Sequence, residues 1–309
     1  MWAECSAEFA KIAMELSSID TPVLVSACLL VLAFLIGCSR GRDTWIFVDF
    51  LATSAFGLGW YFIPDIILGF QVGCPPDGTH LTYTRAFAAC MIGDAVSRYF
   101  LRCSKDASTL VYLLFSRIVG CSVLIISMIY IQYFGGSAWN QNHIFFGMLG
   151  NMLWMMGSVV YYYQSRYSGG HAQLESRLNM HLRLDGFLTL LIGCSCYAFP
   201  DFYLKMQTTL ETYDGAHLHM VRSTGALLIG SSMLSFVAPG FLFDWDKRAL
   251  FTGRIVKVFV TVLAVLYAAA KYDAWGGNLH LYLLMEIIII LNSLLGYYAP
   301  HETERYKSN

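Results

Sequence analysis

Charged residues are scarce in this chain of 309 residues. Asp, Glu, Lys and Arg make up 13% of it and hydrophobic residues 57%, whereas a soluble domain carries roughly 25% charged residues. So few charges leave too little polar surface to face water, and we therefore expect an integral membrane protein that lies in the lipid bilayer. The net charge of -1 offers no basic surface, so nucleic acid is not an expected partner.

The sequence also lacks the motifs of common catalytic and metal sites. It contains no nucleophile elbow, no phosphate-binding glycine loop and no metalloprotease helix motif, and its His and Cys residues do not have zinc-site spacing. No pattern identifies a cofactor. An enzymatic activity is not favoured, although it stays open because lipid enzymes can assemble sites from scattered residues.

The nine cysteines do not read as a disulfide framework. Six lie within apolar runs, where Cys behaves as a small hydrophobe: Cys28, Cys38, Cys90, Cys121, Cys194 and Cys196. A bridge between Cys5 and Cys74 stays open, because both are expected on one side of the membrane. The first twenty residues are acidic and have no apolar core, so neither a cleavable signal nor a mitochondrial presequence is predicted.

What the chain has instead is a series of long apolar runs. About 20 residues are needed to cross a bilayer as a helix, and nine runs approach or exceed that length, near 21–39, 45–66, 82–101, 108–133, 143–163, 182–200, 218–240, 250–270 and 279–299. The connections between them are short. The sequence therefore predicts an all-α bundle of nine transmembrane helices.

The basic residues predict the orientation of these helices, since cytoplasmic loops are enriched in Lys and Arg. One set of alternate loops, with the C-terminus, contains Arg40, Arg42, Arg98, Arg102, Lys105, Arg166, Arg177, Arg183, Lys247, Arg248, Arg305 and Lys307. The other set, with the N-terminus, contains only Lys11, Lys205 and Lys271. We expect the N-terminus outside or in a lumen and the C-terminus in the cytoplasm.

The chain matches itself at an offset of 136 residues, which becomes 137 after a loop insertion. The first matched set is Asp49, Thr53, Gly57, Tyr61, Pro64 and Asp65 with Asp185, Thr189, Gly193, Tyr197, Pro200 and Asp201. The second is Asp77, Gly78, His80, Arg85, Ala89 and Gly93 with Asp214, Gly215, His217, Arg222, Ala226 and Gly230. Recurring Pro-Asp, Asp-Gly-x-His and intramembrane Arg predict two parallel four-helix repeats.

This repeat predicts how the chain is divided. The segments are 1–43 (N-terminal segment and leading helix), 44–166 (repeat A), 167–181 (linker), 182–300 (repeat B) and 301–309 (cytoplasmic tail). Within each repeat the matched residues recur every four positions and so share one helix face. These faces are interpreted as packing seams, with a substrate path as the alternative. A structural ion pair is expected in each repeat, Asp65 with Arg85 and Asp201 with Arg222.

Ionisable residues inside the predicted helices are candidate sites, because charge in lipid is costly. They are Asp94, Arg117, Arg254, Lys257 and Glu286. Asp94 is expected to pair with Arg117. Glu286 is either a proton or cation site or the partner of Lys257 or an Arg. Three of these positions are not matched in the other repeat, since Asp94 corresponds to Ser231, Lys257 to Gly120 and Glu286 to Leu149.

Four histidines, His80, His143, His217 and His280, are expected at the outer side of the membrane. Ordinary interfacial hydrogen bonding is the interpretation adopted, and no metal ligand is assigned. Metal or haem ligation stays open, although no pair lies at the depth of axial haem ligands.

The hairpin that opens each repeat resembles a family of small membrane proteins. The residues that carry the likeness are Tyr197 to Asp201, Asp214-Gly215, Arg222 and Gly225 to Leu228, matched in the first copy by Tyr61 to Asp65, Asp77-Gly78, Arg85 and Gly93. They are similar to the tumour-suppressor-inducible PIG-eleven type of four-helix membrane protein. The resemblance covers about two helices per repeat, and it implies a four-helix unit without implying an activity or catalytic residues.

Two functions from different classes follow from these patterns. The first is transport of a small solute or ion through the interface of the two pseudo-symmetric halves. The second is a non-catalytic accessory or assembly subunit that binds other membrane proteins. The first is favoured by sparse charges within the membrane, and the second by symmetric polar residues that look architectural.

Overall fold

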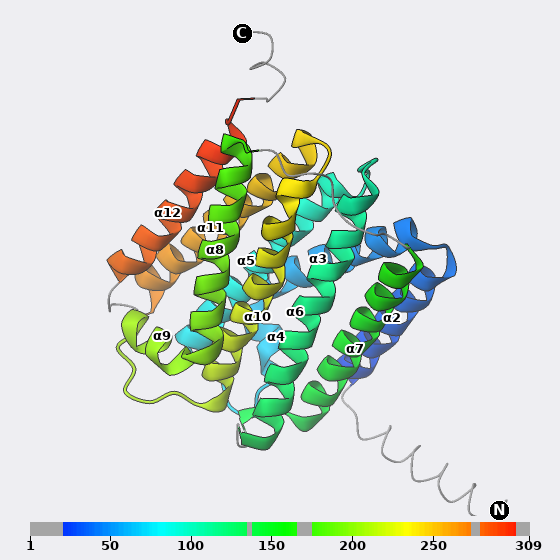
Figure 1. Ribbon diagram of the computed structural model, residues 1–309. Coiled ribbons are helices and arrows are strands. Elements are labelled where there is room, and N and C mark those ends of the chain that lie inside the picture. Colours follow the sequence, from blue (N-terminus) through cyan, green and yellow to red (C-terminus); the bar gives the residue numbers. More distant parts are fainter. Residues whose placement is uncertain (1–20, 135–137, 166–174, 273–278, 301–309) are drawn as a thin grey trace, which may run out of the picture.

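The computed structural model describes residues 21–134, 138–165, 175–272 and 279–300, and this part of the chain is a bundle of helices (Figure 1). The long helices are α2 (Thr21–Ser39), α3 (Arg42–Phe62), α5 (Gly78–Leu101), α6 (Ala107–Phe134), α7 (Gln141–Gln164), α8 (Arg177–Ala198), α10 (Gly215–Val237), α11 (Asp244–Lys271) and α12 (Leu279–Tyr297). Short helices are α4 (Pro64–Gly69), α9 (Pro200–Gln207) and the 3-10 turn η2 (Ala238–Gly240). The described residues contain no β-sheet, only an isolated bridge between Val72 and Trp139.

Several of these helices suit a bilayer. Within the described residues, six are long and apolar enough to cross it, and α8 with α9 makes a seventh if that pair, bent by 100°, is one span. The nine longest described helices have 19 to 28 residues, or about 30 Å or more at 1.5 Å per residue. These lengths and compositions fit a multi-pass integral membrane protein.

Two prolines break the chain in the same way at two places. Pro64 begins α4 and Pro200 begins α9, and the residues before them, Ile63 and Phe199, have closely similar backbone angles outside the helical region. The residue before a proline is disfavoured in the helical region by a clash with the pyrrolidine ring. The carboxylates of Asp65 and Asp201 lie in the first turns of the new helices, where the helix dipole favours negative charge.

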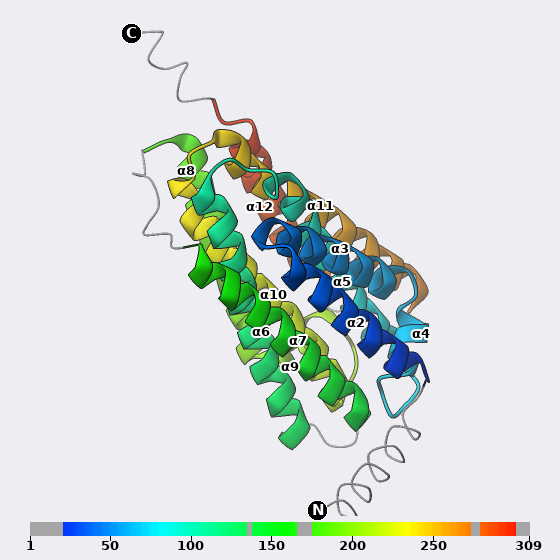
Figure 2. The same ribbon diagram turned by 90° about the vertical axis from the view of Figure 1, so that its right-hand side faces the viewer.

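The first half of the bundle (α3–α7) and the second half (α8–α12) interlock rather than lie side by side. Helix α5 packs against α3 and also along α11, while α10 packs against α8 and also along α6. Figure 2 shows α3, α5 and α11 on one side and α6, α7 and α10 on the other. Equivalent bonds cross between the halves, since Tyr61 donates from its hydroxyl to the Val260 carbonyl and Tyr197 to the Val123 carbonyl.

Helix α2 packs against α3 and α7 and has no counterpart in the second half. The buried indole of Trp45 lies where these elements meet. A Cβ added to Gly37 of α2 or to Gly157 of α7 would collide with it, so both glycines are needed for this close approach. The leading helix is therefore packed into the bundle by specific aromatic contacts.

The core of the described residues has two large apolar clusters at opposite ends of the bundle, with ionisable groups and a small third cluster of Cys90, Leu227 and Leu228 between them. On α11, Phe251 belongs to one cluster and Val265 to the other, and Arg254 and Lys257 lie between the two. The polar groups are thus placed near the middle of the long helices.

The α5–α11 seam gives a test of packing. A Cβ at Gly253 would collide with Ser97 Oγ and the Gly93 carbonyl oxygen. Gly253→Ala is therefore expected to destabilise the protein by about 1–3 kcal/mol, the usual cost of overpacking, seen as a lower melting temperature in detergent. Gly69→Ala is the matched control, because a Cβ there meets no atom within 4 Å. Equal melting temperatures for the two variants would contradict the close approach of α5 and α11.

Candidate functional site

Asp49 is the centre of an ionic group that joins all four long helices of the first half. Its carboxylate accepts from Arg98 Nη1 of α5 at 2.8 Å and from Trp154 Nε1 of α7 at 2.7 Å, and it lies 2.8 Å from Arg117 Nη2 of α6. Arg117 also donates to the hydroxyl of Thr53. One carboxylate thus faces two guanidinium groups, and the group carries one excess positive charge.

Asp185 has the corresponding place in the second half, but with one guanidinium. Arg254 of α11 binds it through two parallel bonds, Nε to Oδ1 at 2.9 Å and Nη2 to Oδ2 at 3.0 Å. Ser235 of α10 donates to Oδ2 at 2.6 Å. The remaining Arg254 nitrogen, Nη1, donates to Ser231 at 3.3 Å. This pair is electrically balanced, and its geometry is the bidentate one that arginine favours with carboxylates.

Lys257 and Glu286 form a third buried ion pair between α11 and α12. Lys257 Nζ lies 3.2 Å from Glu286 Oε2, and both side chains are buried. One of the two interpretations of Glu286 was a partner of Lys257 or an Arg, and the structure shows Lys257 as the partner. A buried pair of this kind is not strong evidence of a stabilising role, because desolvation offsets its attraction.

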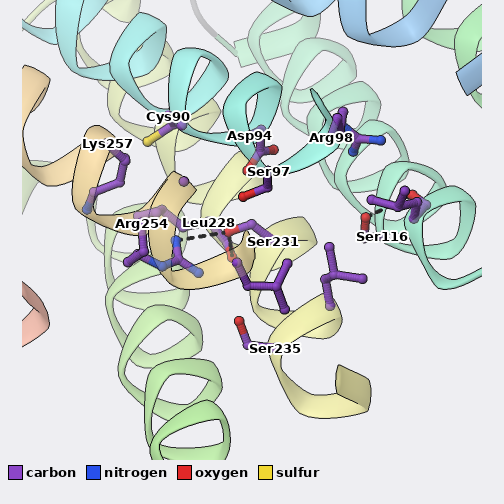
Figure 3. Close-up of a pocket in the computed structure, with 15 residues that line it drawn as sticks. Cys90, Asp94, Ser97, Arg98, Ser116, Leu228, Ser231, Ser235, Arg254 and Lys257 are labelled. Atoms are coloured by element: carbon purple, nitrogen blue, oxygen red, sulfur yellow. Dashed lines mark hydrogen bonds between the residues drawn. The ribbon is translucent and has the colours of Figure 1, made fainter. Parts of the chain in front are cut away.

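Asp94 differs from the other acids because it has no partner. Within the described part of the chain, its carboxylate takes part in no hydrogen bond or ion pair. The expected bond to Arg117 does not form, since Arg117 turns to Asp49 on α3. Asp94 instead lines a cavity with Ser97, Ser231 and Arg254 (Figure 3). In Figure 3, Arg254 bonds to Ser231, the residue that the sequence match places opposite Asp94.

This cavity lies on the seam between the two halves, because α5, α6, α10 and α11 all contribute to its lining. The volume that the centres of water molecules can occupy in this cavity is ≈ 30 Å³. One water needs about 10–15 Å³ by that measure. The cavity is therefore large enough for two or three waters and too small for an organic solute. The Nε of Arg98, buried nearby, has no bonding partner in the described residues.

A second, separate cavity lies next to the first. It has the same water-centre volume of ≈ 30 Å³, and it shares three lining residues with the first: Cys90, Leu228 and Lys257. Glu286 and two tyrosines, Tyr203 and Tyr282, also line it. The Lys257–Glu286 pair therefore borders both the Asp94 cavity and the second one.

We refer to the eight charged residues of this region as the buried ionic layer. They are Asp49, Asp94, Asp185 and Glu286 with Arg98, Arg117, Arg254 and Lys257. The four carboxylates and four basic groups balance only when Asp94 is ionised. Protonation of Asp94 would leave the whole layer positive. Asp94 therefore supplies the charge that compensates the excess guanidinium beside Asp49, although it contacts neither Arg98 nor Arg117 directly.

A different polar group, the histidine cluster, lies where α5 and α10 begin. It comprises Asp77, His80, Asp214 and His217. Each Asp caps its own helix by accepting from the backbone N–H of the His three residues later, and the imidazole Nδ1 in turn accepts from the backbone N–H of that Asp. Each His also reaches the Asp of the other half, with His80 Nε2 3.1 Å from Asp214 and His217 Nε2 3.1 Å from Asp77.

The carboxylates of this cluster are strongly acidic. Burial opposes ionisation of Asp77 and Asp214, but hydrogen bonds from His217 and His80 outweigh it and hold the pKa of both carboxyls far below the ordinary value. Both are therefore ionised at neutral pH. The sequence had predicted ordinary hydrogen bonding for His80 and His217, and it gave no sign that the two would meet.

The predicted pairs of Asp65 with Arg85 and of Asp201 with Arg222 were wrong. Arg85 donates to the Tyr61 carbonyl and lies over the ring of Tyr267, 5.0 Å from its centroid. Arg222 lies 4.4 Å from the Tyr130 ring centroid.

The cause is that each arginine follows its helix toward an aromatic ring of the other half. Asp65 and Asp201 stay exposed in the first turns of α4 and α9. Of the remaining predictions, Cys5 and the side chain of His143 lie outside the described residues, and Cys74 is a free, exposed thiol.

Several residues that border the buried ionic layer were not predicted from the sequence. Trp154 and Ser235 bind the two central carboxylates, and Tyr203 and Tyr282 line the second cavity. Trp154 lies in an apolar run, where aromatic residues are common. The signals that did point to this region were the ionisable residues within apolar runs, among them Asp94 and Glu286.

Comparison with known proteins gives one family model, described as "Domain of unknown function (DUF8292)", which matches residues 47–298. No curated protein and no solved structure matches the chain. The matched range begins within α3 and ends just beyond α12, so it includes the whole buried ionic layer and the histidine cluster. The likeness to the PIG-eleven type stays a prediction.

Asp49 and Asp94 have different surroundings, so replacing each by Asn is expected to change the stability of the protein by different amounts. Asp49→Asn removes the only carboxylate that contacts Arg98 and Arg117 in the described residues, and breaking a buried pair in this way typically costs about 3–5 kcal/mol. Asp94→Asn removes no bond within the described residues but leaves one positive charge of the layer uncompensated, so it should lower the melting temperature less than Asp49→Asn does. Thermal unfolding of the purified variants in detergent, with Asp65→Asn as an exposed control, measures both effects. A strong loss of stability in Asp94→Asn would show that this residue is a structural partner.

Proposed function

The chain belongs to the family described as a domain of unknown function (DUF8292), and we propose that this member carries protons across a membrane through the seam between its two interlocked halves. The observation that carries the proposal is Asp94, a carboxylate that has no hydrogen-bond or ion-pair partner among the described residues and lines a cavity of water-molecule size on that seam. An ionisable group in the membrane interior is costly unless it has a role or a partner.

The size and charge of the cavity favour a proton over other cargo. A volume of ≈ 30 Å³ for water centres holds a short water chain and excludes larger solutes. Arg98, Arg254 and Lys257 also line the cavity, and their positive charge disfavours a metal cation. A proton can bind the carboxylate of Asp94 itself.

The two cavities indicate a route by which a proton could pass Asp94. Water in the first cavity would bring a proton to Asp94, and water in the second would connect the Lys257–Glu286 pair to the far side. Lys257 borders both cavities, so movement of its side chain controls whether the two are joined. Since Asp94 is the acid that balances the layer, its protonation weakens the electrostatic hold on the neighbouring cations.

The membrane arrangement that goes with this proposal has nine spans, a leading helix and two parallel four-helix repeats. The N-terminus lies outside or in a lumen, and the C-terminus in the cytoplasm. Support comes from the alternation of basic segments, since Arg102 directly follows α5 and Lys247 lies in the first turn of α11, whereas Lys205 lies in the short helix α9. Parallel repeats are common in transporters, where a pathway lies between the repeats.

Proton flux into proteoliposomes tests the activity. Wild-type protein should dissipate an imposed pH gradient, measured with an entrapped dye. Asp94→Asn should lower the rate by about a hundredfold, as expected for loss of a proton-transferring group. Glu286→Gln should also slow the flux, because it unbalances Lys257. Asp65→Asn, an exposed acid near the bundle end, should keep the wild-type rate.

Two results would contradict the proposal. One is an unchanged proton flux in Asp94→Asn. The other is wild-type flux that follows a chloride gradient instead of a pH gradient, which would make the positive cavity an anion site. If wild type conducts neither and purifies with stoichiometric membrane-protein partners, the accessory-subunit function becomes the better explanation.

Two native thiols test the orientation. Cys74 and Cys103 are both exposed, and they lie in the connections before α5 and after it. In variants that keep only one of them, a membrane-impermeant maleimide should label Cys74 from outside the sealed cell or organelle. Cys103 should react only after permeabilisation. The reverse pattern would invert the proposed orientation, and equal labelling of both from one side would contradict the crossing of α5.

A further inference from the structure

The histidine cluster joins the halves through two imidazoles that lie face to face. The ring centroids of His80 and His217 are 3.5 Å apart, with 22° between the ring planes. Each ring is bonded at both nitrogens to the Asp77 and Asp214 groups. The proton-relay proposal uses none of these four residues, because they lie at the ends of α5 and α10 and not in the buried ionic layer.

The backbone bonds select one tautomer of each ring when that ring is neutral. A backbone N–H points at Nδ1 of each His, from Asp77 at 3.2 Å and from Asp214 at 3.3 Å. Because Nδ1 accepts these bonds, it carries no proton, and each neutral ring has its proton on Nε2. His80 then donates to Asp214, and His217 donates to Asp77.

Two carboxylates face the two rings. Burial opposes charging of the rings, but hydrogen bonds to Asp214 and Asp77 outweigh it, so the pKa of His80 is raised to about 9 and the pKa of His217 lies above its ordinary value. The described residues place no Lys or Arg in an ion pair with Asp77 or Asp214. The cluster thus offers carboxylate oxygens and imidazole nitrogens to a cation that displaces protons from the rings.

We propose that this cluster binds one divalent transition-metal ion of the zinc class through the carboxylate of Asp77, Nδ1 of His80 and Nε2 of His217. Ligand atoms of these three residues all lie within 4.8 Å of one another. Asp77 oxygens are 3.1 Å from each of the two nitrogens. Ligand atoms of a tetrahedral zinc ion, with bonds of about 2.0–2.1 Å, stand about 3.3 Å apart, so the donor atoms already have metal-site spacing, and the stacked rings must tilt apart for both lone pairs to point at one ion.

Asp214 completes the site from behind the rings. Its Oδ1 lies 3.1 Å from Nε2 of His80 and 2.9 Å from Nδ1 of His217, the two nitrogens that do not face the metal. A metal-binding His usually donates its other N–H to a carboxylate, which fixes its orientation and raises its basicity. One carboxylate here can accept from both rings.

Proton balance is kept when the ion binds. His80 already has its proton on Nε2 and can offer Nδ1 to the metal. His217 must move its proton from Nε2 to Nδ1, where Asp214 accepts it. Both rings are neutral in the metal-bound form, so a ring that is protonated beforehand releases that proton to water. The ion replaces the two long backbone bonds to Nδ1 and the bond from His217 to Asp77, and it brings the charge of the cluster to zero.

The site is also accessible. Asp77 is exposed, whereas both rings are buried, so an ion can enter from the carboxylate side with water as its fourth ligand. Cys74 lies next to the cluster, with Sγ 3.7 Å from Asp214 Oδ2. A carboxylate and two imidazoles favour Zn²⁺, Cu²⁺ or Ni²⁺ over Ca²⁺ and Mg²⁺, which prefer oxygen ligands.

The experiment uses the full chain in nanodiscs, stripped of metal with a chelator. Zn²⁺ is titrated in competition with a chromophoric chelator, and Co²⁺ is added separately as a spectroscopic probe. We expect one Zn²⁺ per chain and a Co²⁺ visible spectrum typical of four-coordinate nitrogen and oxygen ligation. Asp214→Asn should weaken Zn²⁺ binding by about 10- to 100-fold. His217→Gln and Asp77→Asn, which remove ligands, should weaken it further.

The matched control is His280→Gln, which removes an exposed histidine at the start of α12 and should leave Zn²⁺ affinity unchanged. Equal affinity in wild type and His217→Gln would show adventitious surface binding and overturn the proposal. So would a wild-type protein with no saturable Zn²⁺ binding and no four-coordinate Co²⁺ spectrum, in which case the cluster is a hydrogen-bonded clasp only. The wild-type spectrum decides the matter even if a variant fails to fold.

Discussion

The constraint on which this structure depends is that lipid supplies no counter-charge to the middle of the bundle. Charged groups placed there must be neutralised by other parts of the same chain. Asp49 forms ion pairs with a guanidinium of α5 and one of α6, and it accepts a hydrogen bond from Trp154 of α7. Asp185 forms an ion pair with the guanidinium of Arg254 on α11. Each carboxylate lies on the first helix of its half and ties later helices to it. The positions of the helices therefore follow from where each carboxylate finds its guanidinium.

The first half (α3–α7) and the second half (α8–α12) differ in how the charges at their middle are paired. The Asp185–Arg254 pair is balanced, whereas Asp49 faces two guanidiniums and leaves a positive charge. Asp94, which has no partner in the described part of the chain, offsets that charge across a cavity. An architectural role would be served by a direct ion pair, as Lys257 and Glu286 form. A balancing charge held apart from its counterparts and next to water is instead suited to gaining and losing a proton.

Interlocking of the halves explains why the polar contacts at the bundle ends cross between them. Arg85 lies over Tyr267 and Arg222 over Tyr130, and each histidine of the cluster bonds to the aspartate of the other half. A helix that packs along the other half presents its polar groups there, so local pairs such as Asp65 with Arg85 do not form. The same exchange brings two carboxylates and two imidazoles together in one site. Neither half contains that site alone.

The sequence by itself determined the helical bundle, the places where it breaks and which charges lie in apolar surroundings. These are local properties, because hydropathy over about 20 residues sets a helix and Pro64 or Pro200 ends one whatever it packs against. Partners were decided only by the tertiary structure. Glu286 had Lys257 among its alternatives, but Asp94 was expected to meet Arg117 and does not, and the meeting of His80 with His217 had no sequence signal. The physical reason is that an ion pair depends on distances of about 3–4 Å between side chains on different helices, and periodicity along one helix carries no information about which helix lies beside it.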